Sequence, residues 1–352
     1  MPETAVGDAP GRANLMGDHT DYHEGFVLPT LIPQLTRVTL RRRRDNNVSA
    51  ISDAAGAGRY ELGRESKRGG WIDYLQGATE AFAKRGIPLT GFDAQLASDI
   101  PIGAGVSSSA ALTVAFLRAL RELFNATLDD VELAVVARSV ETDFVGAPVG
   151  IMDPMACSVG HRGEALFIDT RTLATERVPL PATVQFAVID SGVAHRHAGG
   201  GYVTRRKESF AAAAALGVDH LRDVRVDDLC RLAALPPLLA RRARHVVTEN
   251  QRVVDAVAAL RSGDGDRLGA LFTASHRSLR DDYQVSTPDV DRLVEIAEHR
   301  PAVFGARLTG GGFGGAIVVA MRPGSAQTAN DIVTEYATTG GRGSLLTIIA
   351  AA

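Results

Sequence analysis

Apolar and polar side chains alternate from Phe92 to Ile100, and this period of two predicts a half-buried strand. A glycine- and serine-rich loop follows the stretch. Beyond the loop the pattern changes, because Leu112, Phe116 and Leu120 recur every four residues. That spacing collects apolar side chains on one face of a helix, which we predict from about Ser108 to Phe124.

Helix-start signals divide the next part of the chain. Residues 127–130, Thr-Leu-Asp-Asp, resemble a capping box and predict a second helix that runs to about Phe144. Pro148 and Gly150 then interrupt the helical pattern. Asp153-Pro154 fits an N-cap followed by proline at the first helical position, which predicts a short third helix.

The remaining pattern predicts a mixed α+β protein with two lobes. Strands are expected near residues 36–40, 166–168, 184–189, 305–309 and 316–321, and helices near 202–216, 238–260, 267–280 and 290–299. The basic run Arg41–Arg44 lies between a strand and a turn signal, which predicts the solvated end of a hairpin. The connection at 179–181 sets the predicted boundary between an N-terminal lobe (residues 1–181) and a C-terminal lobe (182–352).

Composition excludes several classes of function. The chain of 352 residues has a formal net charge of −3, which gives no electrostatic reason to expect nucleic acid or an anionic membrane as a partner. Cys157 and Cys230 are too few for a disulfide framework or a cysteine-based zinc site. Neither a targeting segment nor a long apolar run is found, so we expect a cytoplasmic protein without membrane contact. Nothing implies an obligate protein partner.

Residues 101–111, Pro-Ile-Gly-Ala-Gly-Val-Ser-Ser-Ser-Ala-Ala, join the predicted strand to the predicted helix. A helix N-terminus attracts anions because its first backbone N–H groups are unpaired and the positive end of the dipole lies there. Gly103 and Gly105 allow close approach of a phosphate, and the serines supply hydroxyl groups. No lysine follows, which excludes the GxxxxGK[ST] loop. A helix cap is the alternative, but a cap needs one serine, not three preceded by two glycines.

A second glycine cluster, residues 310–315, contains the spacing GxGxxG. A dinucleotide-binding fingerprint needs a helix after the glycines, whereas the segment that follows is strand-like. A hairpin, or a backbone that approaches a ligand closely, fits the cluster better. His195 and His197 stand in a glycine-rich loop without a third ligand, so a metal site there is not favoured.

The polar block at residues 11–22 holds an arginine, two aspartates and a histidine without helical or strand period. Such groups are buried only when each finds a partner, so their density suits a ligand with many hydroxyl groups, such as a sugar. A solvated loop with turn chemistry is the alternative interpretation of this block.

Taken together, these blocks resemble the signatures of the galactokinases in the GHMP small-molecule kinase family. Residues 11–29 are similar to the pattern GRxNLIGEHTDYxxGxVLP, and residues 101–111 to PxxxGLSSSAA, with Val106 in place of leucine. Gly150–Asp153 resembles the GIMDQ element, and residues 308–315 resemble the glycine-rich third motif. The similarity runs in order over about residues 9–320.

The resemblance implies a ribosomal-S5-domain-2-like N-terminal lobe, a ferredoxin-like α+β C-terminal lobe and an active site between them. It implies transfer of a phosphoryl group from ATP, with Mg²⁺, to the anomeric hydroxyl of galactose. Asp153 would accept the proton of that hydroxyl, and Arg12 would pair with Asp153 and stabilise developing charge. Ser109 and Glu141 would hold the magnesium ion. ATP would lie along Gly103, Ala104, Gly105, Val106, Ser107, Ser108 and Ser109, and the sugar would contact Asp18, His19, Asp21, Gly150 and Tyr202.

The chain departs from the family pattern at three places. Asp18 stands where the family has glutamate, which shortens the side chain by roughly 1.5 Å and predicts weaker galactose binding or wider tolerance at the far end of the sugar. Pro154 replaces glutamine, so an amide side chain and a backbone donor are missing beside the predicted base. The first motif also begins closer to the start of the chain than is usual, so an N-terminal strand or cover is expected to be missing.

These departures leave two alternatives open. The first is a GHMP kinase for another sugar, such as arabinose, galactosamine or fucose. The second is a sugar- and ATP-binding sensor without catalysis, which the presence of Arg12, Asp153, Ser109 and Glu141 disfavours. A binding protein has no need for both a base and a metal-binding carboxylate.

Overall fold

The computed structural model describes residues 2–193 and 198–351, so His195 and His197 lie outside the described residues. The chain forms two compact units, each made of three segments. The first unit comprises residues up to Arg12, 32–101 and 107–159, and the second comprises 13–31, 102–106 and the chain from Gly160 onward. The units are therefore not consecutive along the chain, because two long strands, β1 (Thr4–Asn14) and β3 (Pro29–Arg42), each continue from one unit into the other. The lobe boundary at residue 181 stays a prediction.

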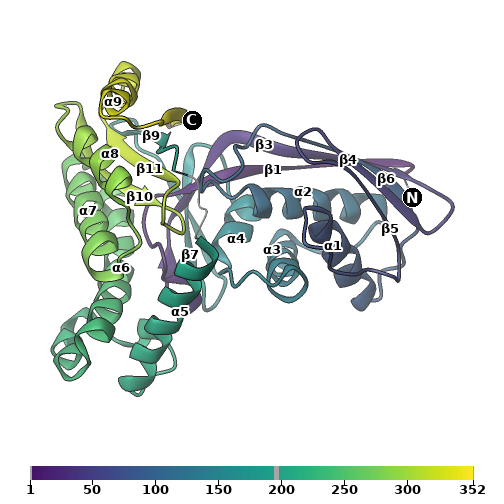
Figure 1. The fold of residues 1–352 in the computed structure, drawn as a ribbon, viewed down its shortest axis with the longest axis horizontal. Helices are drawn as coiled ribbons and strands as arrows, with labels where there is room; N and C mark the ends of the chain where they lie inside the picture. Colours follow the sequence, from purple (N-terminus) through teal and green to yellow (C-terminus); the bar gives the residue numbers. More distant parts are fainter. Residues whose placement is uncertain (1, 194–197, 352) are drawn as a thin grey trace. The chain divides into compact units, whose positions relative to one another are not determined.

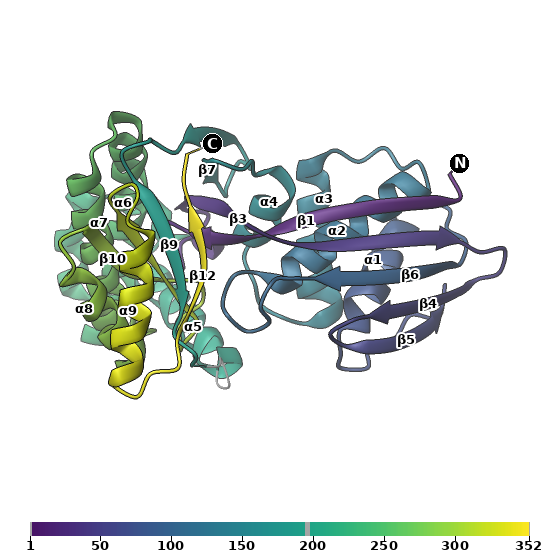
Figure 2. The same ribbon diagram turned by 90° about the horizontal axis from the view of Figure 1, so that it is seen from above.

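The strands of the first unit form a sheet in which sequence neighbours are not always spatial neighbours. β3 pairs antiparallel with β6 (Phe92–Ser98), and β6 pairs in parallel with β4 (Asn47–Ser52). β4 pairs with β5 (Gly56–Glu61), and β1 pairs with β3 (Figure 2). The expected hairpin end at Arg41–Arg44 is wrong, since β6 lies between β3 and β4. The strand predicted at residues 92–100 is confirmed as β6.

Helices α1 (Ile72–Lys84), α2 (Ser108–Leu123), α3 (Asp130–Ser139) and α4 (Met152–Val159) lie on one face of these strands (Figure 1). α2 confirms the predicted helix, and its Phe116 and Leu120 are fully buried. The capping box of α3 is formed by Asp129 and Glu132, not by residues 127 and 130 as predicted. The helix continues as a π-helical turn, η2 (Val140–Val145).

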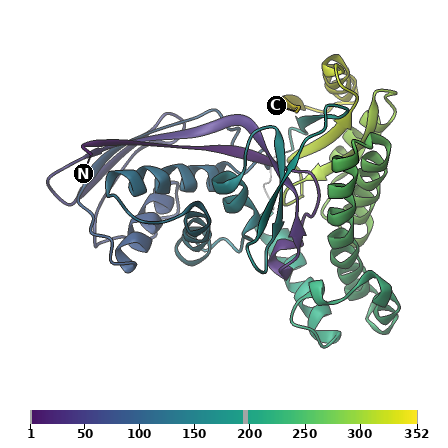
Figure 3. The same cartoon turned by 180° about the vertical axis from the view of Figure 1, so that it is seen from behind.

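The second unit contains an antiparallel sheet with the strand order β10 (Val303–Thr309), β11 (Ala316–Met321), β9 (Gln185–Asp190) and β12 (Ser344–Ile349). Figure 2 shows β9 and β12 beside α9 (Ala326–Thr338), and Figure 3 shows the same unit from behind. The predicted strands at 184–189, 305–309 and 316–321 are confirmed. Its other elements are η1 (Asp21–His23), β2 (Phe26–Val27), β7 (Glu164–Asp169), β8 (Thr175–Pro179), α5 (Ala198–Ala215), η3 (Leu221–Asp223), η4 (Val226–Ala234), α6 (Pro237–Ser262), α7 (Gly265–Arg277), η5 (Ser278–Tyr283) and α8 (Pro288–Glu298).

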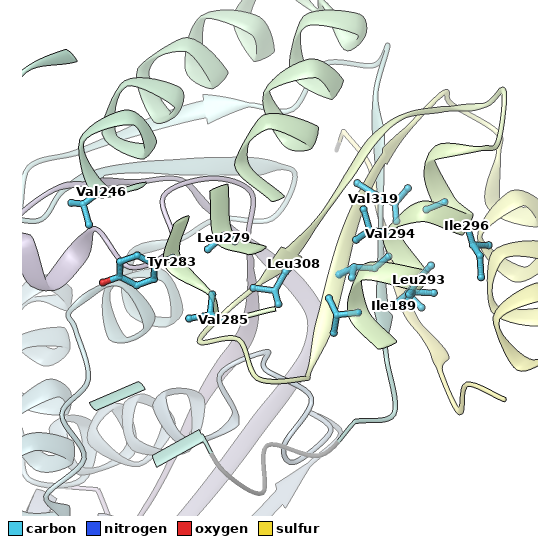
Figure 4. Close-up of a cluster of buried hydrophobic side chains, with 14 of the residues drawn as sticks. Ile189, Val246, Leu279, Tyr283, Val285, Leu293, Val294, Ile296, Leu308 and Val319 are labelled. Carbon is cyan, nitrogen blue, oxygen red and sulfur yellow. The ribbon is translucent and has the colours of Figure 1, made fainter. Parts of the chain in front are cut away.

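The core of the second unit joins the sheet to its helices. Strand residues such as Leu308 and Val319 pack with Leu293 of α8 and Leu279 of η5 (Figure 4). Tyr283 lies at one end of this cluster, and its hydroxyl points away from the aliphatic side chains. The ring is thus fixed by apolar packing while its polar end is left for another partner. No helix in the described part of the chain is long and apolar enough to cross a membrane.

Candidate active site

In the first unit, Arg12 at the end of β1 forms a bidentate pair with Asp153 in the first turn of α4. Arg12 Nε donates to Asp153 Oδ1 at 2.8 Å, and Nη2 donates to Oδ2 at 2.7 Å. The Ser107 hydroxyl also donates to Oδ2, at 2.6 Å. The arginine is 4% exposed, so one side of the pair is shielded from water, which favours these charge-assisted hydrogen bonds. The predicted catalytic residues, and one serine of the predicted phosphate loop, are in direct contact.

Ser107 ends the glycine- and serine-rich loop in a left-handed conformation with φ = 66°. Gly103 and Gly105 also have positive φ, at 81° and 75°, so three residues of this loop use backbone angles that glycine adopts most easily. Ser107 occupies the N-cap position of α2, but its hydroxyl bonds Asp153 and makes no cap bond to the helix. The simple capping interpretation is therefore wrong for this serine, and no side chain at the N-cap satisfies the first N–H groups of α2.

Glu141 lies in the π-helical turn η2 and is 3% exposed. The Ser109 hydroxyl donates to its Oε2 over a long 3.4 Å, while Oε1 is buried without a hydrogen-bond partner among the described residues. Burial, together with the nearby charge of Asp153, raises the pKa of Glu141 to about 8. A buried carboxylate in this state is stabilised by any cation that comes close to it.

Pro154 is buried in the first turn of α4, which begins at Met152. Asp153 is therefore inside the helix and is not its N-cap, contrary to the prediction. The first backbone N–H groups of a helix have no partner within it, so the donor that proline lacks is not missed there. The fixed φ of proline also stiffens the turn that carries Asp153.

In the second unit, Asp18 forms a buried ion pair with Arg307 of β10. Its Oδ1 also accepts a hydrogen bond from the backbone N–H of Gly310 at 3.0 Å. Both carboxylate oxygens thus already have partners inside the protein. Arg307 was not predicted as part of the site. The available signal was a lone arginine within the otherwise apolar segment 303–309.

Glu249 of α6 is a second carboxylate close to Arg307, since Arg307 Nη2 lies 3.6 Å from Glu249 Oε1. Burial alone would raise the pKa of Glu249, but Arg252, Arg307 and His245 outweigh burial and bring the pKa to about 2. Ser275 donates to Glu249 and accepts from Arg307 Nε. The segment that contains Asp18 is therefore held by a network of buried charges.

His19 is buried with a left-handed backbone, φ = 67°. Its ring lies 5.4 Å from that of Tyr202 and 4.8 Å from that of Tyr283, measured between centroids. Asp21 begins η1 and accepts the backbone N–H of Tyr22. The second unit thus brings His19 and Tyr202 into contact and holds Asp18 and Asp21 nearby in sequence. Gly150, also predicted to contact sugar, is buried in the first unit just before α4.

The glycine cluster at 310–315 is a hairpin loop between β10 and β11, as expected, since Thr309 pairs with Ala316. The strand β11 after the loop excludes the dinucleotide-binding interpretation. At Gly312, with φ = 79°, an added Cβ would lie 2.5 Å from the carbonyl oxygen of Val285. Glycine is therefore required at this position by both conformation and space.

Comparison with known proteins agrees with this geometry. Family models match residues 73–161 (GHMP kinases N terminal domain), 256–338 (GHMP kinases C terminal) and 2–42 (Galactokinase galactose-binding signature). The chain is 44% identical to a galactokinase of Chloroflexus aurantiacus, over 90% of this chain and 84% of the relative. It is 42% identical to a galactokinase of Mycobacterium bovis, over 95% of this chain and 93% of the relative.

Solved structures show the same fold. The Lactococcus lactis galactokinase, solved in complex with galactose, matches with a TM-score of 0.93 and 29% identity, over 99% of this chain and 94% of that one. The Methanococcus jannaschii mevalonate kinase matches with a TM-score of 0.72 and 18% identity, over 99% and 98% of the two chains, which shows the fold alone. The fold and the serine loop next to the Arg12–Asp153 pair define a GHMP small-molecule kinase. Within that class, the chain belongs to the galactokinase family.

Proposed function

We propose that this protein transfers the γ-phosphoryl group of ATP to the anomeric hydroxyl of galactose. The observation that carries the proposal is the contact of Asp153 with both Arg12 and Ser107, which joins a carboxylate, a guanidinium and the end of an anion-attracting loop. The family membership of the chain supports galactose as the acceptor. ATP is the donor that GHMP kinases use.

In this mechanism Asp153 accepts the proton of the C1 hydroxyl as that oxygen bonds to phosphorus, while the bond from phosphorus to the ADP oxygen breaks. A carboxylate offers about four acceptor sites over its two oxygens, and the side chain of Asp153 is 32% exposed, so it can be reached by this proton. Arg12 keeps the carboxylate oriented and offsets negative charge that develops on the transferred group. The glycine backbone and serine hydroxyls of residues 103–109 would hold the phosphates.

We also propose Mg²⁺ as the cofactor, held by Glu141 and Ser109. Oε1 of Glu141 is buried and has no hydrogen-bond partner within residues 2–193 and 198–351, and this atom and the raised pKa of the group fit a cation at this position. Among the described residues no cluster of three or more metal-binding side chains occurs. This agrees with magnesium, which keeps water and phosphate oxygens and needs only one or two protein carboxylates. When bound, the ion would neutralise charge on the ATP phosphates.

The mechanism predicts that Asp153→Asn lowers kcat by about 10²–10⁴-fold, because the amide keeps the shape but cannot accept the proton. Release of ADP with galactose measures the change, and calorimetry with galactose checks that the variant still binds sugar. Asp143→Asn is a matched control, since Asp143 is an exposed carboxylate of the same unit. A variant Asp153→Asn that keeps more than a tenth of the wild-type kcat would contradict the role of Asp153.

The magnesium site is tested by Glu141→Gln, with Glu122→Gln as the control on an exposed glutamate. We expect the free Mg²⁺ concentration at half-maximal activity to rise about tenfold for Glu141→Gln, since one charged ligand of a weakly held ion is lost. An unchanged requirement would remove Glu141 from the site.

A panel of aldoses in the same ADP assay separates galactose from arabinose, galactosamine and fucose as acceptors. Binding of sugar and ATP without ADP release for any member of the panel would instead identify a sensor. We place the activity in the cytoplasm, where ATP is abundant and where the unpaired Cys157 and Cys230 stay reduced.

A further inference from the structure

The glycine hairpin, residues 310–315, holds one bulky side chain in a conformation that suits glycine. Phe313 stands between Gly312 and Gly314 and has a left-handed backbone, with φ = 60°. A bulky residue keeps this conformation only when other contacts offset the steric cost. One such contact is made by the backbone N–H of Phe313, which donates to the carbonyl of Val285 at 2.6 Å. The ring of Phe313 makes another, which glycine could not make.

The ring of Phe313 packs on the first turn of α5. A Cβ added to Gly201 would lie 2.6 Å from Cζ of Phe313, so the ring lies directly against the backbone of this glycine. Gly201 is the last of three consecutive glycines, and glycine is the weakest helix former after proline. The start of α5 therefore needs a tertiary contact to hold it, and Phe313 supplies one. The next residue along the helix is Tyr202.

The same hairpin borders the ring of Tyr202. A Cβ added to Gly311 would lie 3.6 Å from Cδ2 of Tyr202, which is an ordinary van der Waals distance. The Tyr202 ring also lies 5.4 Å from the ring of His19 and 5.9 Å from that of Tyr22, measured between centroids. The hairpin thus holds the backbone next to Tyr202 through Gly201 and borders its ring through Gly311.

We infer that Phe313 is a positioning residue, which holds the start of α5 so that the hydroxyl of Tyr202 reaches the sugar. The inference deepens the proposed function and rests on it for the identity of the ligand. Glycine at position 313 would suit the backbone better, but it would leave Gly201 without this contact. Loss of the ring should therefore weaken sugar binding through Tyr202 and leave Asp153, in the first unit, unchanged.

The first test is hydrogen exchange of the protein without sugar, measured at the backbone amides of residues 202–205. The helical bonds of these amides depend on the first turn of α5, so we expect faster exchange there in Phe313→Ala. Phe304→Ala is the matched control, because Phe304 packs in the same way on Gly265 at the start of α7, where an added Cβ would lie 2.5 Å from its Cζ. The control should speed exchange at the start of α7 instead. Unchanged exchange at residues 202–205 in Phe313→Ala overturns the inference, whatever sugar the enzyme uses.

The second test is steady-state kinetics with galactose. We expect Phe313→Ala to raise KM about tenfold and to change kcat less than about threefold, because a binding contact is weakened while the proton acceptor is kept. In a Tyr202→Phe background the same substitution should change KM less than about twofold, since the hydroxyl that Phe313 positions is already absent. Phe313→Leu, which keeps an apolar side chain against Gly201, should restore most of the wild-type KM.

A purely structural role for Phe313 would lower the unfolding temperature and either leave KM unchanged or raise it equally in both backgrounds. Each of these outcomes overturns the inference. If Phe313→Ala does not fold, Gly201→Ala tests the same contact, because its methyl group displaces the ring; KM should then rise with Tyr202 present and change little in Tyr202→Phe. A protein that phosphorylates no sugar contradicts the proposed function, and the exchange experiment still decides whether Phe313 holds the start of α5.

Discussion

At the residue scale, the two acidic side chains of the site illustrate opposite uses of a carboxylate. Asp153 accepts two hydrogen bonds from Arg12 and one from Ser107 and is partly exposed, so it can meet a substrate. Asp18 is fully buried against Arg307 and the backbone of Gly310, so its charge is used within the protein. Removing the charge should therefore affect mainly activity at Asp153 and mainly stability at Asp18, whereas lengthening the Asp18 side chain tests a separate effect on the sugar.

Asp18→Asn should lower the free energy of unfolding by about 3–5 kcal/mol, because Arg307 would be left buried with one partner fewer. Glu249 remains near Arg307, which favours the lower end of that range. Urea unfolding followed by circular dichroism measures the change. Asp8→Asn, which breaks the exposed pair with Arg37, should cost about 1 kcal/mol or less. Equal losses at both positions would show that burial of the Asp18 pair does not matter.

Asp18→Glu tests the prediction about the far end of the sugar. The longer side chain extends the carboxylate by roughly 1.5 Å, so we expect a lower KM for galactose and a stronger preference for galactose over 6-deoxygalactose. Steady-state kinetics with both sugars gives the KM for galactose and the preference between the two sugars. If neither quantity changes while the protein stays folded, Asp18 does not determine recognition at that carbon.

At the element scale, the hairpin between β10 and β11 depends on its glycines. Gly312→Ala should lower the free energy of unfolding by about 2–3 kcal/mol, since the methyl group would meet the carbonyl of Val285 and the residue would keep a left-handed backbone. Gly63→Ala is the control, because Gly63 also has positive φ but has open space around it, so only the backbone strain of about 1–2 kcal/mol applies. A difference near zero between the two variants would show that the loop relaxes around the clash.

Elements with a strong local period were predictable from the sequence. β6, α2 and β11 were found at nearly the expected residues, because alternation or four-residue spacing reports directly on which face is buried. The site pair Arg12–Asp153 followed from the resemblance of short motifs. The prediction of these elements depends only on residues close together in sequence, and the prediction of the residue pair depends on a family pattern.

Long-range pairing and irregular backbone were not predictable. The insertion of β6 between β3 and β4 depends on contacts across about fifty residues, which no local pattern encodes. The π-helical turns η2 and η5 interrupt what reads as continuous helix, yet they carry Glu141 and Tyr283. Arg307 was missed because its partner, Asp18, is almost three hundred residues away along the chain.

At the scale of the whole molecule, buried histidines make stability depend on pH. Burial lowers the pKa of His19 and His23 to about 3 and that of His245 to about 4. In the unfolded chain a histidine titrates near 6.5. The three histidines therefore contribute fully to the free energy of unfolding above pH 6.5. This contribution is lost as pH falls toward 4, because the unfolded chain binds protons in this range and the native protein does not.

His23→Gln should reduce the slope of unfolding free energy against pH by about 1.4 kcal/mol per pH unit between pH 6 and 5, which corresponds to one proton. Urea unfolding at several pH values gives the slope, and comparison between variants cancels other groups such as Glu141. Ser209→Ala is the control, because it removes the hydrogen-bond partner of His23 but keeps the titrating ring. Ser209→Ala should lower the free energy of unfolding and leave its slope against pH unchanged. Equal slopes in the wild type, His23→Gln and Ser209→Ala would contradict the role of His23 in the pH dependence.

The interleaving of the two units has a consequence for synthesis on the ribosome. Leu15, Met16, Val27 and Leu28 are fully buried in the second unit, yet most of that unit begins only at Gly160. At translation rates of about 5–20 residues per second, the nascent chain needs about 7–26 s after Leu28 merely to reach Gly160, and longer to supply their partners. During that interval the early segment exposes apolar surface, so this polypeptide should engage chaperones while it emerges and should resist being split into separately expressed halves.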